Sequence, residues 1–254
     1  MDRMLYVAAT GAAHLERSQA VHANNLANAN TNGFRSEFAE TMARAVRGDG
    51  LEARNYGLTQ APGFDFAPGI IRETGQNLDV AVQGSGFLAV AMPDGREGYS
   101  RAGALSVDSA GRLLTPDGLP LLGGGGPVAL PPYTNVYIAA DGGITIRPEG
   151  QGPETLIQVD QLKLVNPEPG SLMKAAPGLF VAKPPEGADP DAVTVLEPDP
   201  EVTLVSGALE SSNVSAVNEL TEILSIARQF ELEVKMMRKA EEIDESASQL
   251  VRIG

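Results

Sequence analysis

Side chains that could perform chemistry are few in this chain. Its 254 residues contain no Cys, which excludes thiolate nucleophiles, thiolate metal ligands and disulfides together. The two histidines, His14 and His22, are eight residues apart, which on a helix is about 12 Å and too far to share one metal ion. We therefore expect both histidines to pack or to lie on the surface rather than to bind metal.

Two glycine-rich stretches also fall short of a catalytic pattern. Gly84-Ser85-Gly86 lacks the G-x-S-x-G spacing of a nucleophile elbow, and the run from Gly123 to Gly126 is followed by Pro127, not by the Lys-Ser/Thr of a phosphate loop. Both stretches are predicted to be turns. Asp189 and Asp191 lie in a Pro-rich acidic loop, for which a solvated surface is preferred to a cation site. We predict no catalytic residue, no cofactor, no metal site and no small-molecule substrate.

The charge of the chain excludes further classes of function. The formal net charge is −14, and most of it falls between residues 48 and 206. An acidic chain without a basic cluster argues against binding to nucleic acid or to anionic membrane surfaces. No stretch approaches the roughly 18 apolar residues of a membrane-spanning helix. The protein is therefore not expected to be membrane-embedded.

The element around which the chain is organised is a predicted C-terminal helix. Asn213 and Ser215 are good N-cap residues, and no Gly or Pro follows until Gly254, so the helix can extend to about Leu250. Apolar residues follow one another at steps of four and three, which places them on one helix face. This predicted seam consists of Ala216, Leu220, Ile223, Ala227, Phe230, Val234 and Met237. A narrow apolar seam on a long helix predicts partner helices.

The N-terminal residues offer such a partner. A second, weaker seam contains Leu5, Ala8, Ala12, Leu15, Gln19, His22, Leu26 and Ala29. Four Asn between 24 and 30 predict a capped or frayed helix end, with Gly33 as the left-handed residue that closes it. Residues Glu37 to Arg47 could extend helix for a few turns, and the Gly- and Pro-rich stretch from Gly48 to Gly75 is predicted to be an extended linker.

The central residues have a β pattern. From Leu78 onward, short apolar runs alternate with turn signals such as Asp94-Gly95, Asp108 to Gly111, Asp117-Gly118 and Asp141-Gly142-Gly143. Strands at this spacing predict an antiparallel sandwich or barrel-like domain. The fold class is therefore α+β. We expect a helical domain of residues 1–34 and 208–254, an extended linker of 35–75 and a β domain of 76–207.

Both ends of the chain resemble one known family. The stretch ANNLANANTNGFR, Ala23 to Arg35, and the stretch LESSNVSAVNEL, Leu209 to Leu220, are similar to the two terminal signatures of the bacterial flagellar rod and hook proteins. The central segments TGQNLDVAVQGSGFLAV and YSRAGALSVDSAGRLLT resemble the same family. Within this family, the chain most resembles the proximal rod proteins in two stretches, MDRMLYVAATGA at residues 1–12 and RQFELEVKMM at residues 228–237. Distal rod proteins carry extra residues after the Asn-rich motif, and hook proteins are longer.

The resemblance implies a structural function. It implies a subunit of the proximal rod whose terminal helices pair, coiled-coil-like, into the inner tube of a hollow drive shaft that transmits torque across the periplasm. It also implies type III export without a cleaved signal peptide. The implied partners are further copies and other axial proteins, including the distal rod protein. The implied assembly interface comprises Leu5, Ala8, Ala12, Leu15, Leu26, Asn28, Gly33, Phe34, Leu209, Asn213, Val214, Leu220, Ile223, Ala227, Phe230, Val234 and Met237.

Two alternatives stay open at this point. The chain could be a distal rod or hook-type subunit, or, as the rival from another class, an enzyme or carbohydrate-binding β domain with helical extensions. An enzyme should act as a compact monomer. A rod subunit, by contrast, should have mobile ends when it is alone, because an isolated helix without its packing partners is marginal in water.

Overall fold

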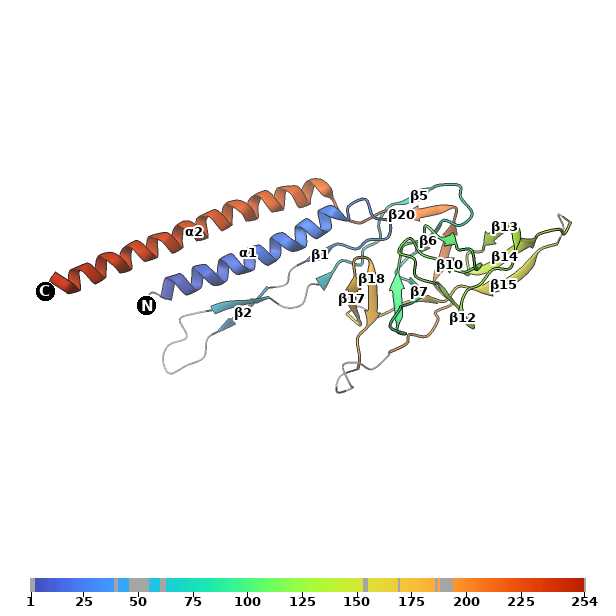
Figure 1. The fold of residues 1–254 in the computed structure, drawn as a ribbon, viewed down its shortest axis with the longest axis horizontal. Helices are drawn as coiled ribbons and strands as arrows, with labels where there is room; N and C mark the ends of the chain where they lie inside the picture. The colour runs from blue at the N-terminus through green and yellow to red at the C-terminus, as the bar shows by residue number, and fades with distance from the viewer. Residues whose placement is uncertain are drawn as a thin grey trace. The chain divides into compact units, whose positions relative to one another are not determined.

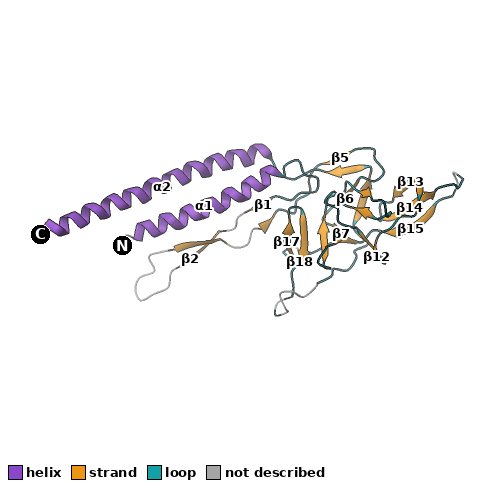
Figure 2. Cartoon of the chain, in the orientation of Figure 1, coloured by secondary structure: helices purple, strands orange, loops and turns teal. Residues whose placement is uncertain are grey.

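The structure, a computed structural model, describes residues 3–253 except 39–40, 46–54, 60–62, 153–154, 169, 186 and 188–193. Asp189, Asp191 and most of the stretch from Gly48 to Pro62 lie outside the described residues. Contacts divide the chain into two units. The first holds residues 1–29, 36–65 and 214–254, and the second holds 30–35 and 66–213. Each unit is built from chain segments that are far apart in sequence. Figure 2 shows the helices in purple and the strands in orange.

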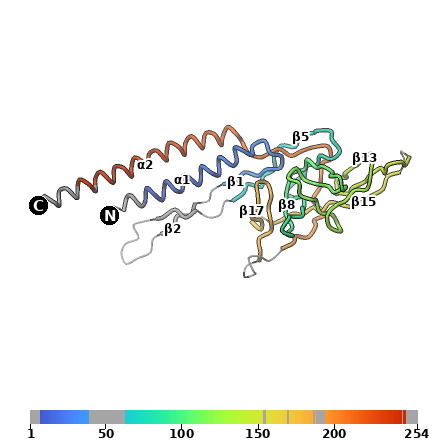
Figure 3. The backbone as a smooth tube through the Cα atoms, viewed as in Figure 1, coloured from blue at the N-terminus to red at the C-terminus, as the bar shows by residue number. Residues whose placement is uncertain are grey.

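The first unit contains both helices. The helix α1 spans Arg3–Ala27 and α2 spans Ala216–Ile253, and the two lie side by side (Figure 3). Ser215 caps α2, because its hydroxyl oxygen lies 3.5 Å from the N–H of Asn218 and its carbonyl accepts the Glu219 N–H. The predicted N-cap is thus confirmed. With 38 residues, α2 is about 57 Å long at 1.5 Å per residue.

The same unit corrects one prediction. Of the stretch from Glu37 to Arg47, the described residues do not extend helix: they form the strands β1, Glu37–Phe38, and β2, Thr41–Ala45. They pair antiparallel with β4, Gly63–Phe64, and β3, Asn55–Thr59. The reason is tertiary. The Asn25 side chain donates to the Glu37 carbonyl (2.8 Å) and accepts the Glu37 N–H (2.9 Å), so it holds the backbone extended as a neighbouring strand would.

The end of α1 also differs from the prediction. The helix ends at Ala27, where the Asn28 side chain donates to the Asn24 carbonyl at 2.9 Å. Gly33 does have a left-handed backbone, with φ of +73°, but it lies six residues beyond the helix. It closes no helix. It meets other backbone instead, since a Cβ built on it would lie 2.3 Å from the Arg101 carbonyl oxygen.

The second unit is the antiparallel β domain that the sequence predicts, and all its strand pairs between named strands are antiparallel. A five-stranded sheet has the order β16-β7-β8-β18-β17, and a three-stranded sheet the order β13-β14-β15. Two-stranded pairs are β6 with β19, β5 with β20, β9 with β10 and β11 with β12. The strands are β5 Ile71–Glu73, β6 Val80–Gln83, β7 Phe87–Ala91, β8 Glu97–Ser100, β9 Ser106–Val107, β10 Leu113–Leu114, β11 Leu122–Gly123, β12 Gly126–Pro127, β13 Tyr133–Ile138, β14 Gly143–Pro148, β15 Ile157–Gln161, β16 Leu164–Val165, β17 Leu172–Ala176, β18 Leu179–Ala182, β19 Thr203–Ser206 and β20 Ala208–Glu210.

The turns of this unit follow the predicted signals. Between β9 and β10, the Asp108 carboxylate accepts the N–H groups of Ala110 and Arg112, and between β13 and β14 Asp141 accepts that of Gly143. Gly84 has a positive φ and starts the turn between β6 and β7, so Gly84-Ser85-Gly86 is a turn as expected. Alternating residues of β13 are buried, and its Val136 and Ile138 join one continuous core.

Candidate assembly surface

Small and branched apolar residues form the contact between α1 and α2. Ala8 and Ala12 are the buried apolar residues of α1, and Ile226 and Ala240 are those of α2, within the described side chains. Gly11 allows a close approach as well, because a Cβ on it would lie 3.1 Å from the Glu233 carboxylate. Small residues at a helix contact let the two backbones come close together. The pair is therefore tight but buries little apolar surface.

One line of α2 residues faces α1. Glu219, Ile226, Glu233 and Ala240 stand seven residues apart, as expected for two helices that run along each other. Ile226 and Ala240 are 5% and 1% exposed, and Glu219 and Glu233 reach polar or small residues of α1. This line lies one residue before the predicted line of Leu220, Ala227 and Val234. The contact with α1 is therefore rotated by about 100° from that half of the predicted seam, but only by about 50° from the half formed by Ile223, Phe230 and Met237.

Polar side chains close the end of the helix pair. His22 Nδ1 on α1 lies 2.6 Å from Glu219 Oε2 on α2, and Asn25 donates to the other oxygen of Glu219 at 3.4 Å. The side chains of His22 and Glu219 are 24% and 13% exposed. Because Asn25 also binds the backbone of Glu37, a single network joins α1, α2 and β1.

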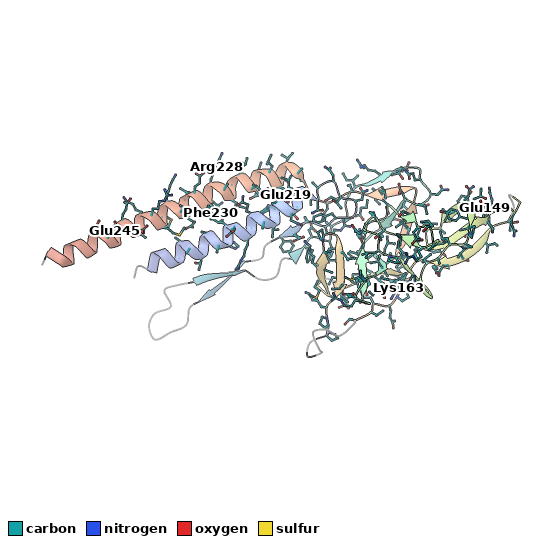
Figure 4. All side chains as sticks on the ribbon, in the orientation of Figure 1. Glu149, Lys163, Glu219, Arg228, Phe230 and Glu245 are labelled. Atoms are coloured by element: carbon teal, nitrogen blue, oxygen red, sulfur yellow. The ribbon has the colours of Figure 1, made fainter. Side chains whose placement is uncertain are left out.

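Several other apolar residues of α2 are open to solvent. Val217, Leu220 and Leu224 follow one another at steps of three and four and are 73%, 51% and 53% exposed. We call these three residues the outer stripe. Figure 4 shows the labelled Arg228 on the side of α2 away from α1, and Phe230 on the side toward it. Leu232 and Ile243 are also exposed. Exposed apolar side chains that line up on one helix face form a candidate interaction surface.

The predicted interface residues fall into both units. In the first unit, Ala8 and Ala12 are buried, Leu220 and Phe230 are exposed, and Leu15, Leu26, Asn28, Val214, Ile223, Ala227, Val234 and Met237 are half-buried, while the side chain of Leu5 lies outside the described part. In the second unit, Gly33 and Phe34 are buried and Leu209 and Asn213 are half-buried. Here the two signatures meet, since Asn213 N–H donates to the Phe34 carbonyl at 3.4 Å. Their use between subunits stays a prediction.

A buried ion cluster in the second unit was not predicted. Arg35 Nη2 lies 2.6 Å from Glu210 Oε1, and Arg101 Nη1 donates to both Glu210 oxygens, at 3.0 and 2.8 Å. All three side chains are at most 1% exposed. Arg35 is the last residue of the first signature and Glu210 is the second residue of the other. A charged residue within each motif was the signal that the sequence offered. Their pairing could not be foreseen from positions so far apart.

Arg101 has further partners that hold it in place. Its Nε donates to the Gly86 carbonyl at 2.8 Å, Nη2 donates to the Gly84 carbonyl, and the guanidinium lies 5.2 Å from the ring centroid of Phe87. Burial, together with the nearby charge of Arg35, lowers the pKa of Arg101 to about 10, while Glu210 opposes the shift. Arg101 is therefore still protonated at neutral pH.

In the described part of the chain, no set of side chains is arranged as a catalytic site. A cleft in the second unit is lined by residues that include Leu122, Gly123, Leu162, Asp199 and Val202. Its Lys163 and Glu97 are committed to each other, with Nζ 2.8 Å from the carboxylate oxygens. Among the described residues, no three His, Asp or Glu side chains gather closely enough to hold a metal ion. Neither helix, over its described length, is long and apolar enough to cross a membrane.

Comparison with known families gives three matches along the chain. Residues 5–35 match the flagella basal body rod protein family. Residues 81–146 match the D1 domain of the flagellar hook protein FlgE/F/G family, and residues 205–250 match the C-terminal domain of the flagellar basal body rod FlgEFG proteins. The first and last matches include the two terminal signatures, and the middle one lies within the β domain.

Individual relatives match over the whole chain. The flagellar basal-body rod protein FlgF of Salmonella typhimurium is 39% identical over 254 residues, and that of Escherichia coli is 38% identical over 256 residues, with both chains covered completely. The flagellar basal-body rod protein FlgG of Agrobacterium fabrum is 32% identical over 266 residues, which cover 95% of this chain and 96% of that one.

Proposed function

The chain belongs to the flagellar basal-body rod protein family, whose members are structural rather than enzymatic, and on that premise we propose that it is a subunit of the proximal rod. The assignment to the proximal rod is supported by two FlgF relatives, at 39% and 38% identity, that exceed the 32% of the Agrobacterium fabrum FlgG, whereas the FlgF of Caulobacter vibrioides is 31% identical. The distal rod and the hook remain the second choice. In the proposal, the rod spans the periplasm and carries torque from the motor to the hook.

The outer stripe of α2 is the observation that carries the proposal. In the subunit, α1 covers the line of Ile226 and Ala240, while Val217, Leu220 and Leu224 stay exposed on the same helix. A helix with two apolar faces can bind one partner within the subunit and another outside it. We propose that the outer stripe packs against helices of neighbouring subunits and so builds the helical wall of a hollow shaft. The neighbours are further copies and other axial proteins.

Charge substitutions on α2 test this proposal. Leu220→Asp places a carboxylate in the proposed interface between subunits, where an unpaired charge costs several kcal/mol. Because Leu220 is 51% exposed in the subunit, the free protein should keep its fold. We expect circular dichroism of the purified variant to be unchanged, and motility and rod completion to be lost. Thr221→Asp, an exposed neighbour that adds the same charge, is the matched control and should swim. A motile Leu220→Asp strain would overturn the proposal.

A further inference from the structure

Three distant chain segments are joined at one carboxylate in the second unit. Glu210 on β20 accepts Arg35 Nη2 from the segment 30–35, Arg101 Nη1, and the Gly69 N–H at 2.7 Å. Backbone bonds reinforce the joint. Gly33 N–H donates to the Glu210 carbonyl at 2.9 Å, and β20 pairs with β5 through Glu210 and Ile71 (Figure 1). The segment that follows α1 and the segment that precedes α2 therefore meet at Glu210.

The charges of this cluster are unequal. Two guanidinium groups share the single carboxylate of Glu210, and all three side chains are at most 1% exposed. Arg101 makes bonds with Glu210, Gly84 and Gly86. Arg35, by contrast, makes one ion pair through Nη2, and its Nε and Nη1 atoms have no hydrogen-bond partner among the described residues. Arg101 balances the charge of Glu210 and also binds two backbone carbonyls of the β domain. Arg35 adds a second positive charge that no further carboxylate in the cluster balances.

We propose that Arg35 is a positioning residue that fastens the segment after α1 to Glu210, and that this clasp, rather than domain stability, is its role. A buried ion pair contributes little net stability, and a buried excess charge opposes it. The Arg35–Glu210 pair does hold the segment after α1 against the segment before α2. Because Arg35 lowers the stability of the domain but links the segment after α1 to the segment before α2, we infer that this link is its role.

Chain length shows what the clasp achieves. Arg35 is eight positions after Ala27, where α1 ends, and Glu210 is six positions before Ala216, where α2 starts. Flexible segments of this length span roughly 15 Å each. Two helices tethered so closely meet at an effective concentration in the millimolar range. The clasp thereby prepares the helix pair in the free subunit, before any neighbour is present. Its value for assembly rests on the proposed rod function, but the clasp itself does not.

Two substitutions separate a clasp from a stabilising element. Arg35→Met keeps the length and volume of the side chain and leaves a balanced Arg101–Glu210 pair, so the melting temperature of the β domain should change by less than about 2 °C. Hydrogen exchange of the peptide that contains Gly33 should become at least tenfold faster, while exchange in β7 and β14 stays unchanged. Glu210→Gln leaves two buried arginines without a carboxylate. It should speed exchange at Gly33 and also lower the melting temperature by about 10 °C.

The measurement is hydrogen exchange with mass spectrometry on the purified full-length protein, together with its thermal unfolding. Arg96→Met, which removes an exposed ion pair with Asp94, is the control and should change neither quantity. Arg35→Lys keeps the charge with fewer donors and should restore part of the protection. Unchanged exchange at Gly33 in Arg35→Met would overturn the proposal. So would a fall in melting temperature equal to that of Glu210→Gln. Motility plays no part in this test, so failure of the rod assignment would leave its outcome standing.

Discussion

His22 on α1 and Glu219 on α2 lie 2.6 Å apart although 197 residues separate them in the sequence. This contact joins the two ends of the chain within one unit. It lies beside Asn25, which binds Glu219 and the backbone of Glu37. The polar network sets the register of the helix pair, because hydrogen bonds are directional whereas contacts among Ala side chains are not.

Glu219→Ala should therefore loosen the helix pair. His22 and Asn25 both lose an acceptor in a half-buried place, which costs about 1 kcal/mol. We expect the helical signal at 222 nm to melt earlier, with the unfolding of the β domain unchanged. Glu222→Ala, on an exposed position of the same helix, is the control. If the two variants melt alike, the network does not hold the helices.

Ile226→Asp should damage the subunit itself. Ile226 is 5% exposed and faces α1, so a carboxylate there is desolvated without a partner, at a cost of several kcal/mol. We expect the purified variant to lose helix content, unlike Leu220→Asp, whose substituted residue is exposed. Circular dichroism of the two proteins side by side makes the comparison. Equal helix content would mean that α1 does not pack on the line of Ile226.

Gly33 should not tolerate a side chain. A positive φ alone costs an alanine roughly 1 kcal/mol. At Gly33 the added Cβ would also meet the Arg101 carbonyl oxygen at 2.3 Å, whereas Gly118, with φ of +76°, has open space around it. We predict that Gly33→Ala destabilises the β domain clearly more than Gly118→Ala does, and that Gly33→Val is worse still. Urea unfolding measures all three. Equal midpoints for the two alanine variants would remove the steric argument.

The free subunit should lose its helices first under proteolysis. The helix pair buries few apolar side chains, whereas the β domain has a continuous core. Trypsin should cut α2 at the exposed Arg228 and Lys235 well before it cuts the β domain at the exposed Arg112. The remaining core should extend over about residues 66–213, within the few residues to which such boundaries can be placed. Resistance of α2 in a protein shown to be monomeric would contradict this expectation.

Local signals account for the parts of the fold that the sequence predicts. The turn at Asp108 and the cap at Ser215 depend on residues close in sequence, and both were predicted. The strand at Glu37 was mistaken for helix, because the side chain that holds it extended belongs to Asn25, twelve residues away on another element. The phase of α2 was predicted from the most regular apolar stripe. That helix has two such faces, and only packing decides which of them meets α1.

The buried cluster lay beyond prediction for a different reason. Arg35, Arg101 and Glu210 are separated by 66 residues or more, and a single sequence contains no signal that pairs them. Two arginines and a glutamate in turn-rich motifs are ordinarily read as solvated charges. Only the meeting of segments 30–35 and 208–213 in one unit shows that these charges are buried together.

A reconstruction of the isolated basal body at side-chain resolution tests the central claim most directly. The claim is that the outer stripe of α2 packs on neighbouring subunits. The account predicts that Leu220 and Leu224 lie within about 4.5 Å of apolar side chains from an adjacent axial subunit, while Ile226 keeps its contact with α1 of its own chain. If Leu220 and Leu224 instead face solvent or the open channel in the assembled rod, the proposed assembly surface is wrong.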